Sequence, residues 1–156
     1  MKILVTGGGG FLGRAIIEQL PTFYPKAKLH ILQRSHHPDL EEKGIVQHRG
    51  SLTDIKTIDT ALADSEIVFH VAAKAGVWGA YQDYYTTNVL GTEHIVRACE
   101  KYGVKKLIYT STPSVVHAGG DLEGIDESTP YATRFSAHYP ATKAMAEQRV
   151  LRANSH

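Results

Sequence analysis

The chain of 156 residues has room for one domain with a substantial buried core, and its 42% hydrophobic and 21% charged residues are ordinary for a globular protein. The formal net charge is +1 and no run of Lys or Arg forms a basic stripe, which excludes the electrostatic signature of nucleic-acid or membrane-surface binding. No apolar stretch reaches the ~20 residues that span a bilayer, no signal-peptide pattern is present, and Cys99 is the single cysteine. We therefore expect a cytoplasmic protein without a disulfide.

Short apolar segments alternate with longer segments of helical periodicity, a pattern that predicts an α/β fold with a Rossmann-type doubly wound parallel sheet. Strands are expected at 2–6, 28–33, 45–48, 67–71 and 105–110, and helices at 11–20, 55–62, 85–102 and 140–152. Residues 113–137 read as a long irregular loop, a length that usually has a functional reason. A helix that leaves a parallel sheet normally feeds another strand, and none follows the last helix. We therefore expect residues 1–156 to be the cofactor-binding part of a longer enzyme whose C-terminal substrate domain is absent.

A glycine-rich turn, Thr6-Gly-Gly-Gly-Gly-Phe-Leu-Gly13, lies between the first strand and the first helix. Gly7 permits the tight turn, Gly10 lets the backbone approach a pyrophosphate, and Gly13 lets the helix lie close to the sheet. The helix N-terminus then offers free N–H groups and a positive dipole end to the phosphates. A flexible turn would explain a glycine triplet alone, but here the flanking strand and helix fall where a dinucleotide-binding unit requires them.

The end of the second strand indicates which dinucleotide is bound. An Asp or Glu about 20 residues beyond the glycine turn would bind the ribose 2′-OH of NAD, but Gln33 and Arg34 stand there. Arg34 can pair with a 2′-phosphate and Ser35 can add a hydroxyl, so NADP(H) is favoured over NAD(H). The alternative for Arg34 is a solvated loop arginine.

The spacing Tyr-x-x-x-Lys occurs at Tyr24, Tyr102 and Tyr139, and only the third pair, with Lys143, lies on one continuous predicted helix. The ammonium beside a phenol stabilises the phenolate, which lets the tyrosine exchange a proton with a carbonyl or an alcohol. A hydroxyl from the cluster at residues 110–112, where the fifth strand ends, would hold the substrate oxygen. Packing of an aromatic ring and solvation of a lysine are the plain alternatives. The nine histidines show no metal-ligand spacing, so no metal is expected.

Five motifs in order along the chain resemble the extended short-chain dehydrogenase/reductases, the group of sugar-nucleotide epimerases and 3β-hydroxysteroid dehydrogenases. They are Thr6-Gly-x-x-Gly-Phe-Leu-Gly13, Val68-Phe-His-Val-Ala-Ala73, Asn88-Val-Leu-Gly-Thr92, Tyr109-Thr-Ser-Thr112 and Tyr139-Pro-x-x-Lys143. The stretches 109–116 and 119–128 look most like the 3β-hydroxysteroid dehydrogenase branch. Within that branch they look like bacterial reductases of 2-alkyl-3-oxoalkanoates, which use NADPH in long-chain olefin biosynthesis.

The resemblance implies a catalytic set of Thr112, Tyr139 and Lys143, with Ser111 as the neighbouring candidate hydroxyl. It implies cofactor contacts at Gly7, Gly10, Phe11, Leu12, Gly13, Arg34, Ser51, Leu52, Ala72, Ala73, Tyr139 and Lys143. One departure concerns the adenine contact, where the family's Gly-Asp-Leu-x-Asp reads Gly-Ser-Leu-Thr-Asp at residues 50–54. Ser51 thus stands where the family has an acid.

The expected function is reversible reduction of a 3-oxo to a 3-hydroxy group on a hydrophobic substrate. The resemblance also implies a homodimer formed through the helices at 85–102 and 140–152. A sugar-nucleotide epimerase or dehydratase with retained NAD would use the same residues, and Gln33 with Arg34 argues against it. A non-catalytic NADP-binding module is a third alternative, which leaves the set of Thr112, Tyr139 and Lys143 without a purpose.

Overall fold

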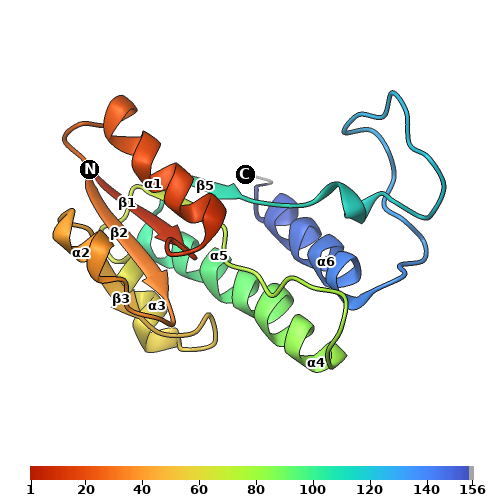
Figure 1. The fold of residues 1–156 in the computed structure, drawn as a ribbon, viewed down its shortest axis with the longest axis horizontal. Helices are drawn as coiled ribbons and strands as arrows, with labels where there is room; N and C mark the ends of the chain where they lie inside the picture. Colours follow the sequence, from red (N-terminus) through yellow and green to blue (C-terminus); the bar gives the residue numbers. More distant parts are fainter. Residues whose placement is uncertain (155–156) are drawn as a thin grey trace.

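The computed structural model describes residues 1–154. One sheet of five parallel strands has the order β3-β2-β1-β4-β5 (Figure 1). The strands are β1 (Lys2–Thr6), β2 (Lys28–Gln33), β3 (Val46–Arg49), β4 (Ile67–His70) and β5 (Lys106–Tyr109). The helices are α1 (Phe11–Phe23), α2 (Pro38–Glu42), α3 (Ile55–Leu62), α4 (Tyr81–Tyr84), the π-helical η1 (Tyr85–Leu90), α5 (Gly91–Tyr102), the 3₁₀-helical η2 (Pro113–Val115) and α6 (His138–Ala153).

Alternation along the strands divides the core into two layers, one on each face of the sheet. Ile3, Val5 and Ile31 pack with residues of α1 and α2 on one face. Leu4 and Leu32 pack with α3 and α5 on the opposite face. Both layers are buried aliphatic side chains, as expected for a parallel sheet that is covered by helices on both sides. The predicted doubly wound fold is confirmed.

The chain reverses its direction of travel across the sheet between β1 and β4, which pair side by side. Crossovers after β1 lead toward β2 and β3, whereas β4 continues to β5 on the other side. The carboxyl ends of β1 and β4 therefore diverge into helices on opposite faces, and this opens a crevice where open α/β sheets bind their ligands.

The structure corrects several predicted boundaries. The third predicted helix begins at Tyr81 rather than at residue 85, and α4, η1 and α5 follow one another without a break. The first helix continues past Pro21 to Phe23, because proline near a helix end removes only one hydrogen bond. The short α2 was not predicted; its single buried residue, Leu40, gives too brief an apolar pattern. Residues 155–156 of the predicted domain lie outside the described residues.

Helix α6 packs against α5, η1 and η2 beside the end of β5 rather than on the sheet itself (Figure 1). The segment between η2 and α6 has no regular structure and extends away from the body of the molecule, as predicted for this part of the 113–137 loop. Within residues 1–154, none of the helices combines the length and the apolar character needed to cross a membrane.

Candidate active site

The glycine turn after β1 makes a close-packed cradle at the crevice. Gly7 has φ +71° and a Cβ there would lie 3.0 Å from the Ala72 backbone, so the turn requires glycine. A Cβ at Gly13 would lie 2.2 Å from the carbonyl oxygen of Gly7, which confirms the close approach of α1. At Gly10 a Cβ would meet only that same oxygen, at 3.3 Å, so the outer side of the cradle is open. No side chain caps α1, which leaves its first N–H groups for a phosphate.

Gln33, the last residue of β2, is buried, and its side-chain amide forms hydrogen bonds with the segments around it. Its Oε1 accepts from the N–H of Gly9 at 2.5 Å, and its Nε2 donates to the carbonyl oxygen of Ser35 at 2.9 Å and to Oε1 of Gln47 at 3.2 Å. Gln33, at the position expected to bind the ribose, is therefore a neutral residue that joins β2 to the glycine turn by a hydrogen bond. It brings no negative charge to that end of the crevice.

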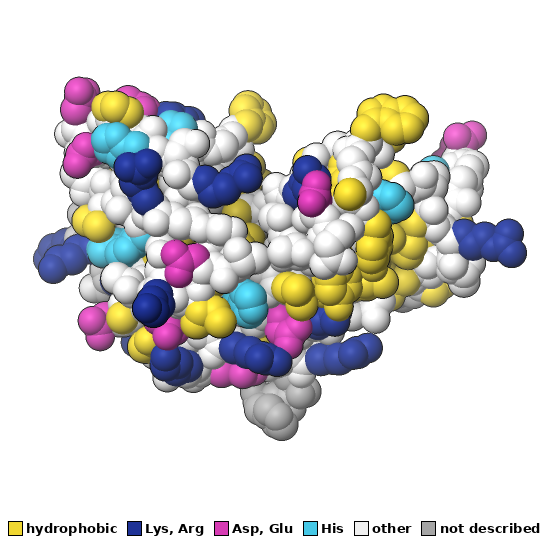
Figure 2. All heavy atoms as spheres, turned by 90° about the horizontal axis from the view of Figure 1, so that it is seen from below, with side chains coloured by type: hydrophobic (Ala, Val, Ile, Leu, Met, Phe, Trp, Pro, Cys, Tyr) yellow, Lys and Arg dark blue, Asp and Glu magenta, His cyan; other side chains and the backbone are white. Residues whose placement is uncertain are grey.

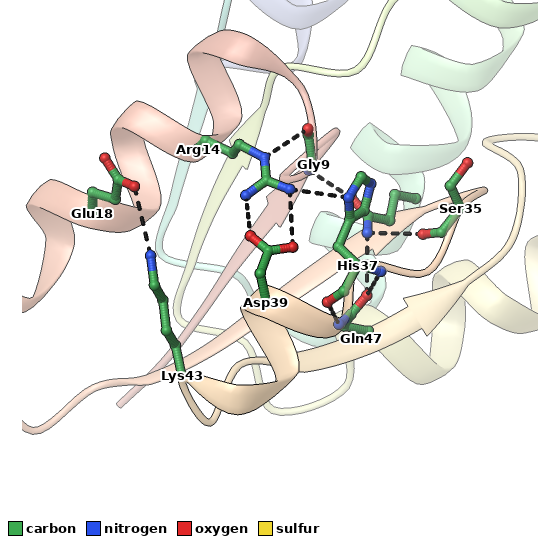
Figure 3. Close-up of polar contacts among 9 residues, drawn as sticks. Gly9, Arg14, Glu18, Ser35, His37, Asp39, Lys43 and Gln47 are labelled. Carbon is green, nitrogen blue, oxygen red and sulfur yellow. Dashed lines mark hydrogen bonds and ion pairs between the residues drawn. The ribbon is translucent and has the colours of Figure 1, made fainter.

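Arg14, on the first turn of α1, organises the loop after β2 (Figure 3). Its guanidinium pairs with the carboxylate of Asp39, donates to Nδ1 of His37 at 3.0 Å and donates to the carbonyl oxygen of Gly9 at 3.1 Å. Gln47 holds the His37 backbone from β3 with hydrogen bonds of 2.7 and 3.0 Å. Arg14 is thus neutralised by an acid. Arg34 on the same loop is exposed and has no ion pair among the described residues.

A cleft of about 950 Å³ runs over the cradle and along the strand ends. Ten of the predicted cofactor contacts line it: Gly7, Gly10, Phe11, Leu12, Gly13, Arg34, Ser51, Leu52, Ala72 and Ala73. Tyr139, Lys143 and Thr112 are not among its lining residues. Gln33 and Ser35, which the sequence already suggested for the ribose end of the site, also line it. Other residues of its wall were not predicted from the sequence, namely Gly9, Leu32, His37, Gly50, Val71, Lys74, Ala75, Asp83, Thr86 and Thr87. Gly9, Gly50, Val71 and Lys74 each adjoin a predicted contact in the chain, and that proximity could have identified them.

One buried amide connects the wall of this cleft to α6. Oδ1 of Asn88 accepts from the N–H of Lys74 at 2.7 Å, and its Nδ2 donates to the Lys74 carbonyl at 3.0 Å and to the Thr142 hydroxyl at 3.1 Å. Asn88 lies in the π-helical segment η1, a geometry that is frequent at functional sites. Thr142 stands between Tyr139 and Lys143 in the chain, so this contact sets α6 against the cleft.

A second buried network holds the end of β4. The Thr6 hydroxyl accepts from the N–H groups of Val71 and Ala72 at 3.1 Å each, and Oγ1 lies 2.7 Å from Nδ1 of His70. Its proton therefore points to Nδ1, and Nε2–H of His70 donates to the Thr92 hydroxyl at 2.9 Å. Burial, with a smaller effect from the Lys143 charge, lowers the pKa of His70 to about 3. The neutral imidazole thus orients the Thr6 hydroxyl, which in turn holds the backbone of Val71 and Ala72 on the wall of the cleft.

Lys143 is the buried cation of the site, with 3% of its surface exposed. Its Nζ donates to the carbonyl oxygen of Thr110 at 2.5 Å and lies 4.1 Å from the centre of the Tyr109 ring. Burial lowers the Lys143 pKa to about 8, although the nearby carboxylate of Glu147 acts in the opposite direction. The burial of the Tyr109 phenol, together with its electrostatic interactions with Glu147 and Tyr139, raises the pKa of Tyr109.

The predicted catalytic residues lie on two elements, Thr112 just after β5 and Tyr139 with Lys143 in the first part of α6. Tyr139 and Lys143 lie one turn apart on α6, and this confirms the continuous helix expected for them. Thr112 caps η2, where its Oγ1 accepts from the Ser114 N–H at 3.3 Å and donates to the Ser114 hydroxyl at 3.2 Å. The hydroxyl of the alternative candidate, Ser111, donates to Glu147.

The remaining titratable residues of the described chain, Met1 to Asn154, form no metal-binding cluster. Among residues 1–154 no group of three or more His, Cys, Asp or Glu side chains is placed to hold a metal ion. Cys99 is buried, and burial raises the pKa of its thiol to about 12. On the face shown in Figure 2, basic and acidic side chains are interspersed rather than gathered into a basic field.

Curated relatives match nearly the whole chain. It is 48% identical over 156 residues to the 2-alkyl-3-oxoalkanoate reductase of Stenotrophomonas maltophilia, covering 99% of this chain and 47% of that protein. It is 45% identical to the 2-alkyl-3-oxoalkanoate reductase of Shewanella oneidensis, covering 96% and 38%. A 3-beta-hydroxysteroid dehydrogenase of Mycolicibacterium neoaurum is 32% identical, covering 98% and 43%. The chain therefore spans less than half the length of these relatives.

Solved structures share the fold. The UDP-glucose 4-epimerase of Thermus thermophilus, in complex with NAD, superposes with a TM-score of 0.82 at 30% identity over 97% of this chain and 50% of that chain. The UDP-glucuronic acid 4-epimerase of Bacillus cereus, also with NAD, gives 0.83 at 26% identity over 100% and 53%. Over residues 4–156 the sequence matches the 3-beta hydroxysteroid dehydrogenase/isomerase family. With a Rossmann sheet, a glycine cradle and a Tyr-x-x-x-Lys helix that agree with this match, the chain belongs to the 3-beta hydroxysteroid dehydrogenase/isomerase family.

Proposed function

We propose that this chain is the cofactor-binding part of a reductase that interconverts a 3-oxo and a 3-hydroxy group on a hydrophobic substrate. The observation that carries the proposal is the buried Lys143, one turn after Tyr139 and hydrogen-bonded to the end of β5. A buried ammonium is costly unless it is paired, so a lysine kept there with a lowered pKa is a functional-site candidate.

The cofactor proposed is a nicotinamide dinucleotide, and NADP(H) is favoured over NAD(H). The fit rests on the open outer side of Gly10, the uncapped start of α1 and a cleft large enough for a dinucleotide. Arg34 lines that cleft without an ion pair among the described residues, and neutral Gln33 occupies the place of the acid that NAD enzymes use. Arg14 pairs with Asp39 and does not line the cleft, so Arg34 is the cation proposed to bind the phosphate.

The proposed mechanism gives one role to each of three side chains. When bound, the reduced nicotinamide supplies the hydride that reduces the substrate carbonyl carbon. The phenol of Tyr139 gives its proton to the carbonyl oxygen, and the Lys143 ammonium stabilises the phenolate that remains. The hydroxyl of Thr112 donates a hydrogen bond to the same oxygen, which stabilises the charge that develops there. Its present contacts to Ser114 are long and local, so a rotation about one bond frees it.

The substrate class proposed is 3-oxo acyl compounds such as 2-alkyl-3-oxoalkanoates, and the relatives that are 48% and 45% identical support it. In that case the enzyme would act in the biosynthesis of long-chain olefins. An NAD-retaining sugar-nucleotide epimerase is the second candidate, because two structural neighbours are epimerases with NAD. Mass spectrometry of the nucleotide that copurifies separates the two, since retained NAD supports the epimerase.

Two further features of the whole enzyme belong to this proposal. A further domain would supply the rest of the substrate-binding pocket. It could pack beside the edge strand β5, where the Ile108 side chain is 39% exposed. A homodimer would form through the segments 85–102 and 140–152, which the structure shows as η1 with α5 and as most of α6. Figure 2 shows hydrophobic side chains gathered on one part of the surface. Independently, Tyr81 of α4 and Met145 of α6 are exposed apolar side chains that contact each other. The oligomeric state by light scattering tests this part, and a strictly monomeric enzyme would contradict it.

The reductase proposal is tested with protein that carries this chain and its remaining length. NADPH consumption is measured against panels of 3-oxo acyl compounds, 3-oxosteroids and nucleotide sugars, with NADH in parallel. We expect turnover with the 3-oxo acyl panel and NADPH. Conversion of nucleotide sugars without net cofactor consumption would favour the epimerase, and cofactor binding without any turnover would favour a non-catalytic module.

A further inference from the structure

Glu147 joins three segments that meet beside the proposed catalytic residues. It lies on α6 one turn after Lys143 and is half-buried. One carboxylate oxygen accepts from the hydroxyl of Ser111 at the end of β5, and the other accepts from the hydroxyl of Tyr131 at 2.9 Å. No single stretch of sequence brings these three residues together, since 36 positions separate Ser111 from Glu147.

The first consequence concerns the two candidate hydroxyls. An ionised carboxylate can only accept, so the Ser111 proton points at Glu147 and is not available to a substrate oxygen. Thr112 donates only to the neighbouring Ser114 hydroxyl, at 3.2 Å. A charge-assisted bond is harder to break than this neutral one. The contact of Glu147 with Ser111 therefore leaves Thr112 as the hydroxyl that can turn to the substrate.

The second consequence concerns the irregular segment before α6. Tyr131 lies in that segment, and its bond to Glu147 ties the segment to the helix. The N–H of Ala132 donates to the carbonyl oxygen of Val115 at 3.0 Å and ties it to η2. Burial and the bond to Glu147 raise the pKa of Tyr131 to about 12, which keeps the donating proton in place at neutral pH.

The third consequence concerns charge. Lys143 lies over the Tyr109 ring of β5 and interacts electrostatically with His70 on β4 and with Glu147 on α6. Tyr139 on α6 and Tyr131 on the irregular segment act on Tyr109 in the same way. Asn88 contacts α6 from η1 as a neutral amide, whereas α5 directs Glu93 toward Arg97 and Arg149. Burial raises the pKa of the Tyr109 and Tyr131 phenols and lowers that of the His70 imidazole, so these three groups are neutral at pH 7. Glu147 therefore supplies the negative charge that acts on the buried ammonium, without a direct ion pair between the two side chains in the described part of the chain.

We propose that Glu147 is a positioning residue of this active site: it draws Ser111 away from the substrate, docks the Tyr131 segment and balances the charge of Lys143. The roles of Thr112 and Lys143 in this statement rest on the proposed function. The geometry of Glu147, Ser111 and Tyr131 does not.

The charge role is tested without turnover by nuclear magnetic resonance of the chain labelled with ¹³C-lysine. The Lys143 side-chain signal, assigned with Lys143→Met, is titrated between pH 6 and 11. Glu147→Gln removes the charge with little change of shape, and we expect the Lys143 midpoint to fall by about 0.5 to 1 unit. Glu93→Gln is the matched control, because it removes a carboxylate that pairs with α6 elsewhere, and it should leave the midpoint unchanged. An unmoved midpoint in Glu147→Gln, or an equal shift in the control, overturns this role.

The positioning role is tested independently in the active enzyme, which keeps the proposal falsifiable if Glu147→Gln does not fold. Thr112→Ala should lower kcat at least about tenfold more than Ser111→Ala does, since only Thr112 would contact the substrate. The reverse order contradicts the assignment. Tyr131→Phe should increase proteolytic cleavage within residues 116–137 and leave the Lys143 midpoint in place. If the wild-type enzyme shows no NADPH turnover, the proposed function is refuted. The titration of Lys143 still tests the charge role of Glu147 in that case.

Discussion

The side-chain amide of Asn88 holds the backbone of Lys74 from both sides, with hydrogen bonds of 2.7 Å to its N–H and 3.0 Å to its carbonyl oxygen. Lys74 lies on the wall of the cofactor cleft, and Asn88 also binds Thr142 of α6. Two parts of the proposed active site, the cleft after β4 and the helix with Tyr139, are thus fixed to each other by one residue.

Replacing Asn88 should therefore damage both parts together. Asn88→Ala leaves the Lys74 N–H, the Lys74 carbonyl and the Thr142 hydroxyl without this partner, and we expect a loss of about 2–4 kcal/mol in the free energy of unfolding. Urea denaturation followed by circular dichroism measures it. Gln82→Ala, which removes an exposed hydrogen bond from the same run of helix, should cost less than about 0.5 kcal/mol. Equal losses in the two variants would show that Asn88 is not a special anchor.

Cofactor choice should depend on Arg34. Arg34→Ala removes the cation available to a 2′-phosphate, so the Kd for NADPH should rise by about 10- to 100-fold and the Kd for NADH by less than about threefold. Calorimetric titration of the chain with each dinucleotide measures both. Lys43→Ala is the control, since that lysine pairs with Glu18 outside the cleft. Equal weakening of both dinucleotides by Arg34→Ala would remove the assignment of NADP(H).

A single charge at residue 33 should reverse this preference. Gln33→Glu keeps an oxygen that can accept from the Gly9 N–H and adds a negative charge beside the expected ribose. We expect tighter binding of NADH and weaker binding of NADPH, which the same titrations measure. Unchanged selectivity would place the ribose away from the end of β2.

The activity of the enzyme should decline as the pH rises through about 8. Burial lowers the Lys143 pKa to about 8, so the ammonium that stabilises the Tyr139 phenolate is present below this pH and is lost above it. The decline is measured as the profile of kcat for carbonyl reduction between pH 6 and 10.

Replacing the proposed proton donor should stop turnover without removing the cofactor. Tyr139→Phe should lower kcat by at least about 100-fold and leave dinucleotide binding nearly unchanged. Activity close to normal in that variant would overturn the role of Tyr139.

Acid should destabilise the fold through His70. Its pKa is about 3 in the folded chain and ~6.5 when unfolded, so between these values only the unfolded chain binds the proton, and stability falls as the pH drops. His30, whose pKa burial lowers to about 4, acts in the same direction. Urea denaturation of His70→Leu between pH 7 and 5 should show a shallower slope, by up to ~1.4 kcal/mol per pH unit. Thr92→Val, which removes only a hydroxyl partner, should keep the original slope.

Local sequence patterns predicted the elements that depend on local causes. Glycine spacing identified the cradle at residues 7–13, and four-residue spacing on an uninterrupted helical segment separated Tyr139 from two other tyrosines. The start of the third helix was wrong because residues 81–84 carry no clear apolar period, and their helical state follows from the packing of Tyr84 under the loop that it binds at Trp78. Helix α2 escaped prediction for the same reason, since one buried leucine makes no pattern.

By itself, the sequence determined the Rossmann sheet, the glycine cradle and the helix that carries Tyr139 and Lys143. Each of these depends on the spacing of residues that are close together in the chain. Only the tertiary structure decided that Gln33 closes on Gly9, that Asp39 neutralises Arg14, and that Glu147 collects Ser111 and Tyr131. These contacts join residues that are 16 to 36 positions apart. The physical reason is that a hydrogen-bond partner is chosen by distance in the folded chain, and the order of strands in a sheet sets that distance.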